Sequence, residues 1–149
     1  MTTIMVRQNL RTRIKQHEGY RPVPYRDSEG NMTIGYGHKI TPDEVATLTH
    51  LTVDEASALF TKDFLVALES AEKEFASCWG RMGPARQGVL LEMIFQMGRR
   101  GVAGFKGMRR ALDKGDYRKA AAEMVDSLWA EQTTDRALRL VKVMLRGRE

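Results

Sequence analysis

The sequence predicts a predominantly helical α+β fold, with a small β-hairpin lobe, a connecting helix and an all-α C-terminal lobe. Prolines and turn residues interrupt helical periodicity between residues 20 and 40, whereas apolar residues recur at helical spacing through most of the remainder. We expect one domain over residues 1–149. In this division the small lobe covers about 15–52, the connecting helix 53–75, and the helical lobe 76–149 together with the N-terminal helix.

The first elements are a helix and a β-hairpin. Residues 4–16 carry apolar side chains at helical spacing, and Gly19 is a common helix stop. Pro22 and Pro24 then exclude a helix interior. Two short β-like runs flank the turn residues 28–31, so we predict a hairpin, with a third short strand near Lys39–Ile40.

The rest of the chain is expected to be helical. Thr41–Pro42–Asp43–Glu44 is typical of a helix start, and this short helix should end near Thr49. Thr52 and Glu55 form a capping-box pattern that opens the long helix to about Phe75. Three further helices are predicted, over Pro84–Met97, over Asp116 to about Glu131, and from Thr133 or Thr134 to Met144 or Leu145.

Composition limits the classes of partner. There are 24 basic and 19 acidic residues, so the net charge of +5 favours polyanions such as nucleic acid, an anionic membrane or an acidic polysaccharide. The one cysteine, Cys78, allows no internal disulfide, and the three histidines show no zinc-type spacing. The N-terminal residues lack the apolar core of a signal peptide.

Two acids and a hydroxyl near the hairpin form a candidate site. Taken singly, Glu18 would be solvated at a helix end, Asp27 would be a turn residue, and Thr33 would serve β propensity. Taken together, two carboxylates on adjacent elements can flank a cleft, which is the minimum apparatus for glycoside hydrolysis. One must be partly buried to stay protonated, while the other stays ionised on the polar hairpin beside a water that Thr33 can orient.

The same residues lie in a family-specific pattern. The segment EGYRPVPYRDSEGNMTIGYGH (18–38), followed by MIFQMGRRGVAGF (93–105) and SLWAEQTTDRA (127–137), resembles the phage lysozymes of glycoside hydrolase family 24 over nearly the whole chain. The resemblance implies a two-lobed, lysozyme-like fold that cuts the β-1,4 bond between N-acetylmuramic acid and N-acetylglucosamine. It also implies that Glu18 is the general acid and that Asp27 with Thr33 places the attacking water, giving inversion without a metal or cofactor.

Other positions are assigned by the same resemblance. Phe95 and Gln96 match a segment that lines the family's cleft, although plain core packing is an equal alternative for Phe95. Arg136 matches an arginine near the catalytic Glu and would help to hold Glu18. At Lys39 the family type has an apolar residue, so only a contact between sugar and the backbone would be kept at this position. We take these four positions as substrate-binding candidates.

Further matches and departures concern structure and specificity. His38 and Asp63 match a structural pair, and Phe105 and Trp129 are expected in the core. The chain between His38 and Asp63 is shorter than in the family type by about a helix. Met108 and Glu123 replace polar substrate-contacting positions, which leaves the preference for peptide stems open.

Three alternatives remain beside this interpretation. An inactive peptidoglycan-binding module would not need Glu18, and a nucleic-acid binder would show an aromatic-interleaved basic stripe, which the chain lacks. The basic segment 135–149 could lie on an anionic membrane, but a final helix packed on the core is favoured. As an endolysin the protein would be a monomer held in the host cytoplasm until a holin-type pore protein gives access to the wall, and a virion-associated role would look similar.

Overall fold

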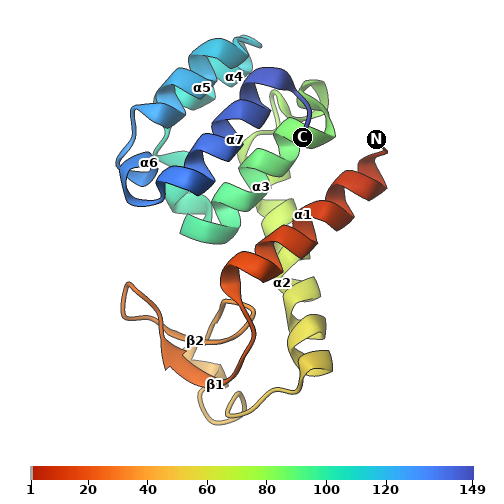
Figure 1. The fold of residues 1–149 in the computed structure, drawn as a ribbon, viewed down its shortest axis with the longest axis vertical. Coiled ribbons are helices and arrows are strands. Elements are labelled where there is room, and N and C mark those ends of the chain that lie inside the picture. Colours follow the sequence, from red (N-terminus) through yellow and green to blue (C-terminus); the bar gives the residue numbers. More distant parts are fainter. Residues whose placement is uncertain (1) are drawn as a thin grey trace. The chain divides into compact units, whose positions relative to one another are not determined.

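The computed structural model describes residues 2–149 and has the predicted α+β class (Figure 1). Within this range the helices are α1 (Thr3–Glu18), α2 (Val53–Glu74), α3 (Trp79–Ala103), α4 (Lys106–Asp113), α5 (Tyr117–Val125), α6 (Leu128–Gln132) and α7 (Thr134–Arg146), with a 3-10 helix η1 (Pro42–Glu44). The strands are β1 (Arg21–Arg26), β2 (Met32–Gly35) and β3 (His38–Lys39).

The chain divides into two compact units, and the division falls within α1 and α2. Arg11–Val66 form one unit, which we call the sheet unit. The N-terminal residues through Leu10 and the segment Ala67–Glu149 form the other, which we call the helical unit. Glu18, Asp27, Thr33 and Lys39 therefore belong to the sheet unit, whereas Phe95, Gln96 and Arg136 belong to the helical unit.

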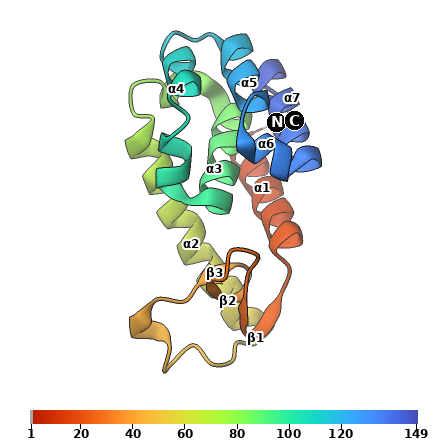
Figure 2. The same ribbon diagram turned by 90° about the vertical axis from the view of Figure 1, so that its left-hand side faces the viewer.

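The sheet has the order β1-β2-β3 and is antiparallel throughout (Figure 2). Tyr25 on β1 pairs with Thr33 on β2, and Thr33 pairs in turn with Lys39 on β3. A bulge interrupts the β1–β2 register between Arg21 and Tyr25, where Pro22 and Pro24 cannot donate ladder hydrogen bonds. The predicted hairpin and third strand are confirmed.

A small core supports this sheet within its own unit. Ile34, Leu51 and Ala56 are buried together, and partly buried apolar side chains pack against them, namely Tyr20, Tyr36, Ile40, Leu48 and Leu59. The hydroxyl of Tyr20 donates to the carbonyl oxygen of Leu51 at 2.7 Å. This bond ties the start of the hairpin to the segment that leads into α2.

The short helix expected over residues 41–49 is wrong, because only the 3-10 helix η1 forms there. Glu44 accepts hydrogen bonds from the N–H and hydroxyl of Thr41, so the helix start forms as the sequence indicates, but the helix does not continue past Glu44. The capping box that opens α2 is confirmed. The Thr52 hydroxyl accepts the N–H of Glu55 at 3.1 Å, and the Glu55 carboxylate accepts the N–H of Thr52 at 3.0 Å.

The centre of the helical unit is the apolar stretch of α3. Gly83 and Gly98 have left-handed, non-helical backbone angles inside α3, so the regular helix lies between them and agrees with the predicted 84–97. Its buried side chains include Val89, Leu90, Leu91, Met93 and Ile94. Helix α7 packs against α3 and α5, and α4 packs against α5.

The single helix predicted from Asp116 to about Glu131 is wrong, since the chain forms α5 and α6 instead. Asp116 caps α5 by accepting the N–H of Lys119, as the sequence indicates. The break follows Val125, because the hydroxyl of Ser127 accepts the N–H of Ala130 and starts a new helix.

The last helix packs on the core, which agrees with the favoured interpretation of the basic C-terminal segment. The apolar face of α7 is buried, namely Ala137, Leu140, Val141, Val143 and Met144. Arg86 donates to the carbonyl oxygens of Met144 and Leu145 and closes the helix end. Among the residues described, no helix combines the length and apolarity that a membrane crossing requires.

Candidate active site

Glu18 is the last residue of α1, and its side chain lies directly against Gly37. A Cβ atom added at Gly37 would be 2.6 Å from Oε2 of Glu18 and 2.8 Å from its Cδ. Gly37 also has φ of +81°, in the left-handed region that disfavours other residues. Glycine is therefore favoured on both counts, because another residue would be strained at this φ and would have to displace the half-buried Glu18 carboxyl.

Asp27 follows β1 and is held by the backbone of its own turn. Its Oδ1 accepts the N–H of Asn31 at 2.8 Å and the N–H of Glu29 at 2.9 Å. Its Oδ2 has one long contact, 3.5 Å to the side-chain amide of Asn31. One carboxylate oxygen is thus committed to the turn, while the other is available to a water molecule.

The turn also determines the protonation state of Asp27. The N–H of Asn31 is the main cause that lowers the pKa of the Asp27 carboxyl, opposed by partial burial. The N–H of Glu29, the Asn31 amide and the positive charge of Lys39 lower this pKa further. Asp27 is therefore ionised at neutral pH, as a group that accepts a proton from water must be.

Thr33 lies in the middle strand and is almost fully buried, at 2% exposure. Its hydroxyl donates to the carbonyl oxygen of Asn31 at 2.9 Å. Because the single hydroxyl proton is used in this bond, the oxygen can receive a further hydrogen bond only as an acceptor. Lys39 is its cross-strand partner on β3, so the two side chains lie on the same face of the sheet.

His38 is confirmed as the partner of Asp63 and has a second carboxylate partner. Its Nδ1 lies 2.9 Å from Asp63 and its Nε2 lies 2.9 Å from Glu44. The hydrogen bond to Asp63 is the main cause that raises the pKa of His38 to about 9, with a further rise from Glu44 against the effect of burial. The resulting imidazolium links β3, η1 and α2, so the role of His38 is structural.

In the helical unit, Gln96 makes a defined contact with Trp129. Its Oε1 accepts the indole N–H of Trp129 at 3.0 Å, and the Trp129 ring meets Phe105 edge to face at 6.1 Å. Trp129 is buried as expected, whereas Phe105 and Phe95 are only partly buried. Gln96 therefore helps to fix the orientation of the Trp129 ring.

Arg136 belongs to a buried ion cluster that the sequence analysis did not identify. Its Nε donates to Glu92 at 3.1 Å, and Nη2 of Arg139 donates to the same carboxylate at 2.6 and 2.7 Å. Glu92 is completely buried. The signal was an acid inside the apolar run VLLEMIF, since a buried carboxylate requires cationic or hydrogen-bonding partners.

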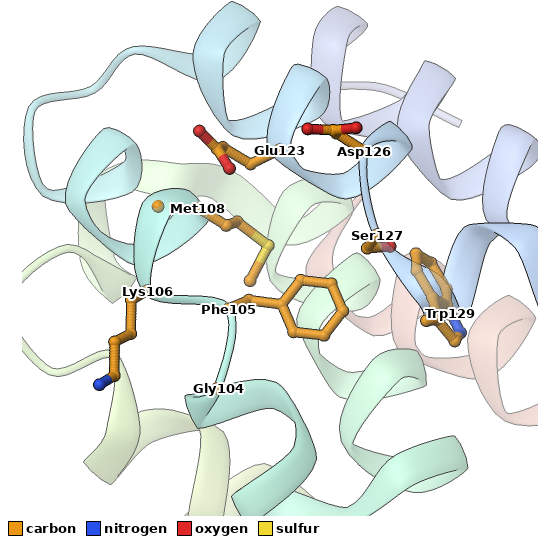
Figure 3. Close-up of a pocket in the computed structure, with 9 residues that line it drawn as sticks. Gly104, Phe105, Lys106, Met108, Glu123, Asp126, Ser127 and Trp129 are labelled. Carbon is orange, nitrogen blue, oxygen red and sulfur yellow. The ribbon is translucent and has the colours of Figure 1, made fainter.

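A pocket of about 340 Å³ opens beside Phe105 and Trp129 (Figure 3). Figure 3 shows the carboxylates of Glu123 and Asp126 on one side and the rings of Phe105 and Trp129 on the other, while the ammonium group of Lys106 points away. Glu123 lies against Gly107 and pairs with Lys119 at 3.3 Å. The pocket thus combines aromatic and acidic walls.

The structure places the sequence-predicted residues in two groups, one in each unit. Glu18 ends α1, whereas Asp27, Thr33 and Lys39 belong to the sheet and its turn. Phe95 and Gln96 lie on α3 and Arg136 lies on α7. Among residues 2–149, no group of three or more His, Cys, Asp or Glu side chains is placed to hold a metal ion.

Comparison with known proteins adds an independent finding. A family model described as phage lysozyme matches residues 15–146. The chain is 30% identical over 161 residues to the probable T4-type lysozyme 2 of Dictyostelium discoideum, which covers 93% of this chain and 95% of that protein. It is 30% identical over 134 residues to the endolysin of Salmonella phage P22, covering 89% and 88% of the two chains. It is 32% identical over 155 residues to the pre-baseplate central spike protein Gp5 of Enterobacteria phage T4, covering 90% of this chain and 27% of that protein.

Proposed function

The chain belongs to the phage lysozyme family, and from this premise we propose that it cuts the β-1,4 bond between N-acetylmuramic acid and N-acetylglucosamine with inversion. It is a glycoside hydrolase of the lysozyme type that degrades peptidoglycan. The observation that carries the finer proposal is the contrast between the two acids. The two carboxyl groups are partly buried alike; backbone N–H groups hold Asp27 ionised, and the Glu18 carboxyl lies directly against Gly37.

In the proposed reaction Glu18 is the general acid. Its proton passes to the glycosidic oxygen as the bond from that oxygen to the anomeric carbon breaks. The carboxyl must be protonated at the start, which partial removal from water favours. Gly37 leaves room for the acid, because a Cβ atom at this position would occupy the space of the carboxyl group.

Asp27 and Thr33 would place and activate the water. The water donates one hydrogen bond to the Thr33 oxygen, which can only accept, and the other to Oδ2 of Asp27. Its oxygen bonds to the anomeric carbon from the face opposite the leaving group, and Asp27 takes the released proton. Glu18 ends ionised and Asp27 protonated, and exchange with solvent restores both. Inversion predicts roughly 6.5–9.5 Å between the two carboxyl groups.

Phe95, Gln96, Arg136 and Lys39 are proposed to bind the glycan. Nη2 of Arg136 is buried without a hydrogen-bond partner in the described part of the chain, which supports a role in binding because unsatisfied buried donors are costly. Gln96 would act through Trp129 and Lys39 through its backbone, while the charge of Lys39 lowers the pKa of Asp27. No cofactor is proposed.

The biological role that fits best is that of an endolysin which lyses the host cell. We propose that it works as a monomer, stays in the host cytoplasm until a holin-type pore opens the membrane, and then reaches the wall. The likeness to a central spike protein keeps a virion-associated role as the second candidate. Expressing the protein inside cells with and without a co-expressed pore protein, and assaying purified virions for its presence, distinguishes the two roles.

The test compares the wild type with Glu18→Gln at equal, verified folding. Chloroform-permeabilised Gram-negative cells should lose turbidity, and purified peptidoglycan should release reducing ends, only with the wild type. NMR of the first products should show the α-anomer, as inversion of a β-linkage requires. If both proteins clear the suspension equally, lysis does not depend on Glu18, and the basic helix α7 becomes the leading candidate for its cause. Binding without cleavage by the wild type would indicate a binding module.

A further inference from the structure

Tyr25 lies among the three proposed catalytic residues, although nothing in the sequence analysis selected it. It stands directly opposite Thr33 in the β1–β2 pair, and Thr33 stands opposite Lys39 in the β2–β3 pair. Because cross-strand partners share a face, Tyr25, Thr33 and Lys39 form one row across the sheet. Asp27 follows Tyr25 by two residues.

The ring of Tyr25 is held in place from one side. The guanidinium carbon of Arg21 lies 4.0 Å from the ring centroid, which is close enough for a cation–π contact. Arg21 and Tyr25 both lie on β1, on either side of the irregularity in the β1–β2 register. The phenol is therefore preorganised, with its orientation set by β1 itself.

The hydroxyl of Tyr25 is polar, partly buried and unused by the protein. Throughout residues 2–149 it has no hydrogen-bond partner, whereas the hydroxyl of Tyr20 in the same unit is bonded to Leu51. Burial is the main cause that raises the pKa of Tyr25, and the negative charges of Glu18 and Asp27 raise it further, against Arg21. The hydroxyl is therefore neutral near pH 7, and it can both donate and accept a hydrogen bond.

We propose that Tyr25 is a further substrate-contacting residue, whose neutral hydroxyl hydrogen-bonds a hydroxyl or N-acetyl group of the sugar next to the bond that is cut. This inference rests on the proposed function, because the sugar is placed by Glu18 and Asp27. The ligand chemistry follows from the group itself, since a neutral hydroxyl that can donate and accept suits an uncharged, hydroxylated ligand. Arg21 is then a positioning residue that acts through the ring.

The test compares Tyr25→Phe with Tyr20→Phe, because each removes one phenolic oxygen and keeps the ring. Tyr25→Phe should keep the wild-type Tm and lower kcat/KM for reducing-end release by about 10- to 100-fold, the effect of one lost hydrogen bond to the substrate. Tyr20→Phe should lower Tm, because it breaks the bond to Leu51, and keep kcat/KM below its melting range.

Co-sedimentation with purified peptidoglycan separates this inference from the proposed function. In the Glu18→Gln background, adding Tyr25→Phe should weaken binding. Wild-type kcat/KM in Tyr25→Phe, or a loss of activity only in proportion to a fall in Tm, overturns the role of Tyr25 and leaves the lysozyme activity standing. If the wild type binds but does not cleave, the proposed function fails, and the binding comparison still decides whether Tyr25 contacts the glycan. If the wild type does neither, both are overturned.

Discussion

At the scale of single residues, Gly37 shows how closely the backbone approaches the proposed acid. Gly37→Ala would place a Cβ atom 2.6 Å from Oε2 of Glu18 and must displace that carboxyl. We expect kcat to fall at least about 10-fold, because a displaced acid no longer reaches the glycosidic oxygen. The measurement is reducing-end release, together with Tm for the strain of about 1 kcal/mol that alanine meets at positive φ.

Gly115→Ala is the matched control for this substitution. Gly115 has a similar φ of +70°, but a Cβ atom there would meet nothing within 4 Å. The two variants should therefore lose similar stability while only Gly37→Ala loses activity. Full activity in Gly37→Ala would mean that Glu18 tolerates displacement and is not the acid.

At the scale of secondary-structure elements, His38 makes stability depend on pH. Its pKa in the folded state is about 9, against 6.5 as the ordinary value. The stabilisation is therefore complete below about pH 6.5 and is lost as pH rises through 9. The shift corresponds to at most about 3 kcal/mol. Unfolding of the wild type and His38→Asn should differ most at pH 6 and converge near pH 10.

His50→Asn is the control for this comparison, because His50 is exposed and lies outside the β3–η1–α2 junction. Its effect on the free energy of unfolding should be small at every pH. A difference between the wild type and His38→Asn that stays constant from pH 6 to pH 10 would rule out the charged bridge to Asp63 and Glu44.

The contact between α3 and α7 depends on a carboxylate without solvent access. Glu92→Gln removes the charge that Arg136 and Arg139 share, so we expect a loss of about 3 kcal/mol in the free energy of unfolding. Urea denaturation measures it. Glu69→Gln is the control, because its pair with Lys73 is exposed to solvent, which screens the attraction. Equal effects would mean that the buried cluster contributes no more than a surface pair.

At the scale of the whole molecule, the net charge of +5 should assist binding to a polyanionic wall. Salt screens such attraction, with a Debye length of about 10 Å at 0.1 M. We therefore expect KM for purified peptidoglycan to rise several-fold when salt is raised from about 20 to about 200 mM, with little change in Tm. Peptidoglycan whose stem-peptide carboxyl groups have been amidated serves as the control substrate, because it keeps the same glycosidic bond and carries less negative charge. Identical salt dependence for both substrates would contradict the electrostatic contribution.

The sequence alone determined the features that depend on near neighbours. The Thr52–Glu55 capping box, the hairpin and the ends of α1 all follow from residues within four positions of one another. The same short-range signals misjudged residues 41–49, where one 3-10 turn follows the helix start, and the break between α5 and α6, where the Ser127 hydroxyl caps a new helix. The residues Glu18, Asp27 and Thr33 were predicted because their pattern is compact and family-specific.

Only the tertiary structure decided which distant side chains meet. Glu92 is 44 positions from Arg136, His38 is 25 from Asp63, and the close approach of Gly37 to Glu18 depends on how the hairpin returns to α1. Tyr25 joined the site through strand register, which brings it opposite Thr33. The physical reason is that propensity and capping act along the chain, whereas burial, ion pairing and register are properties of the packed fold.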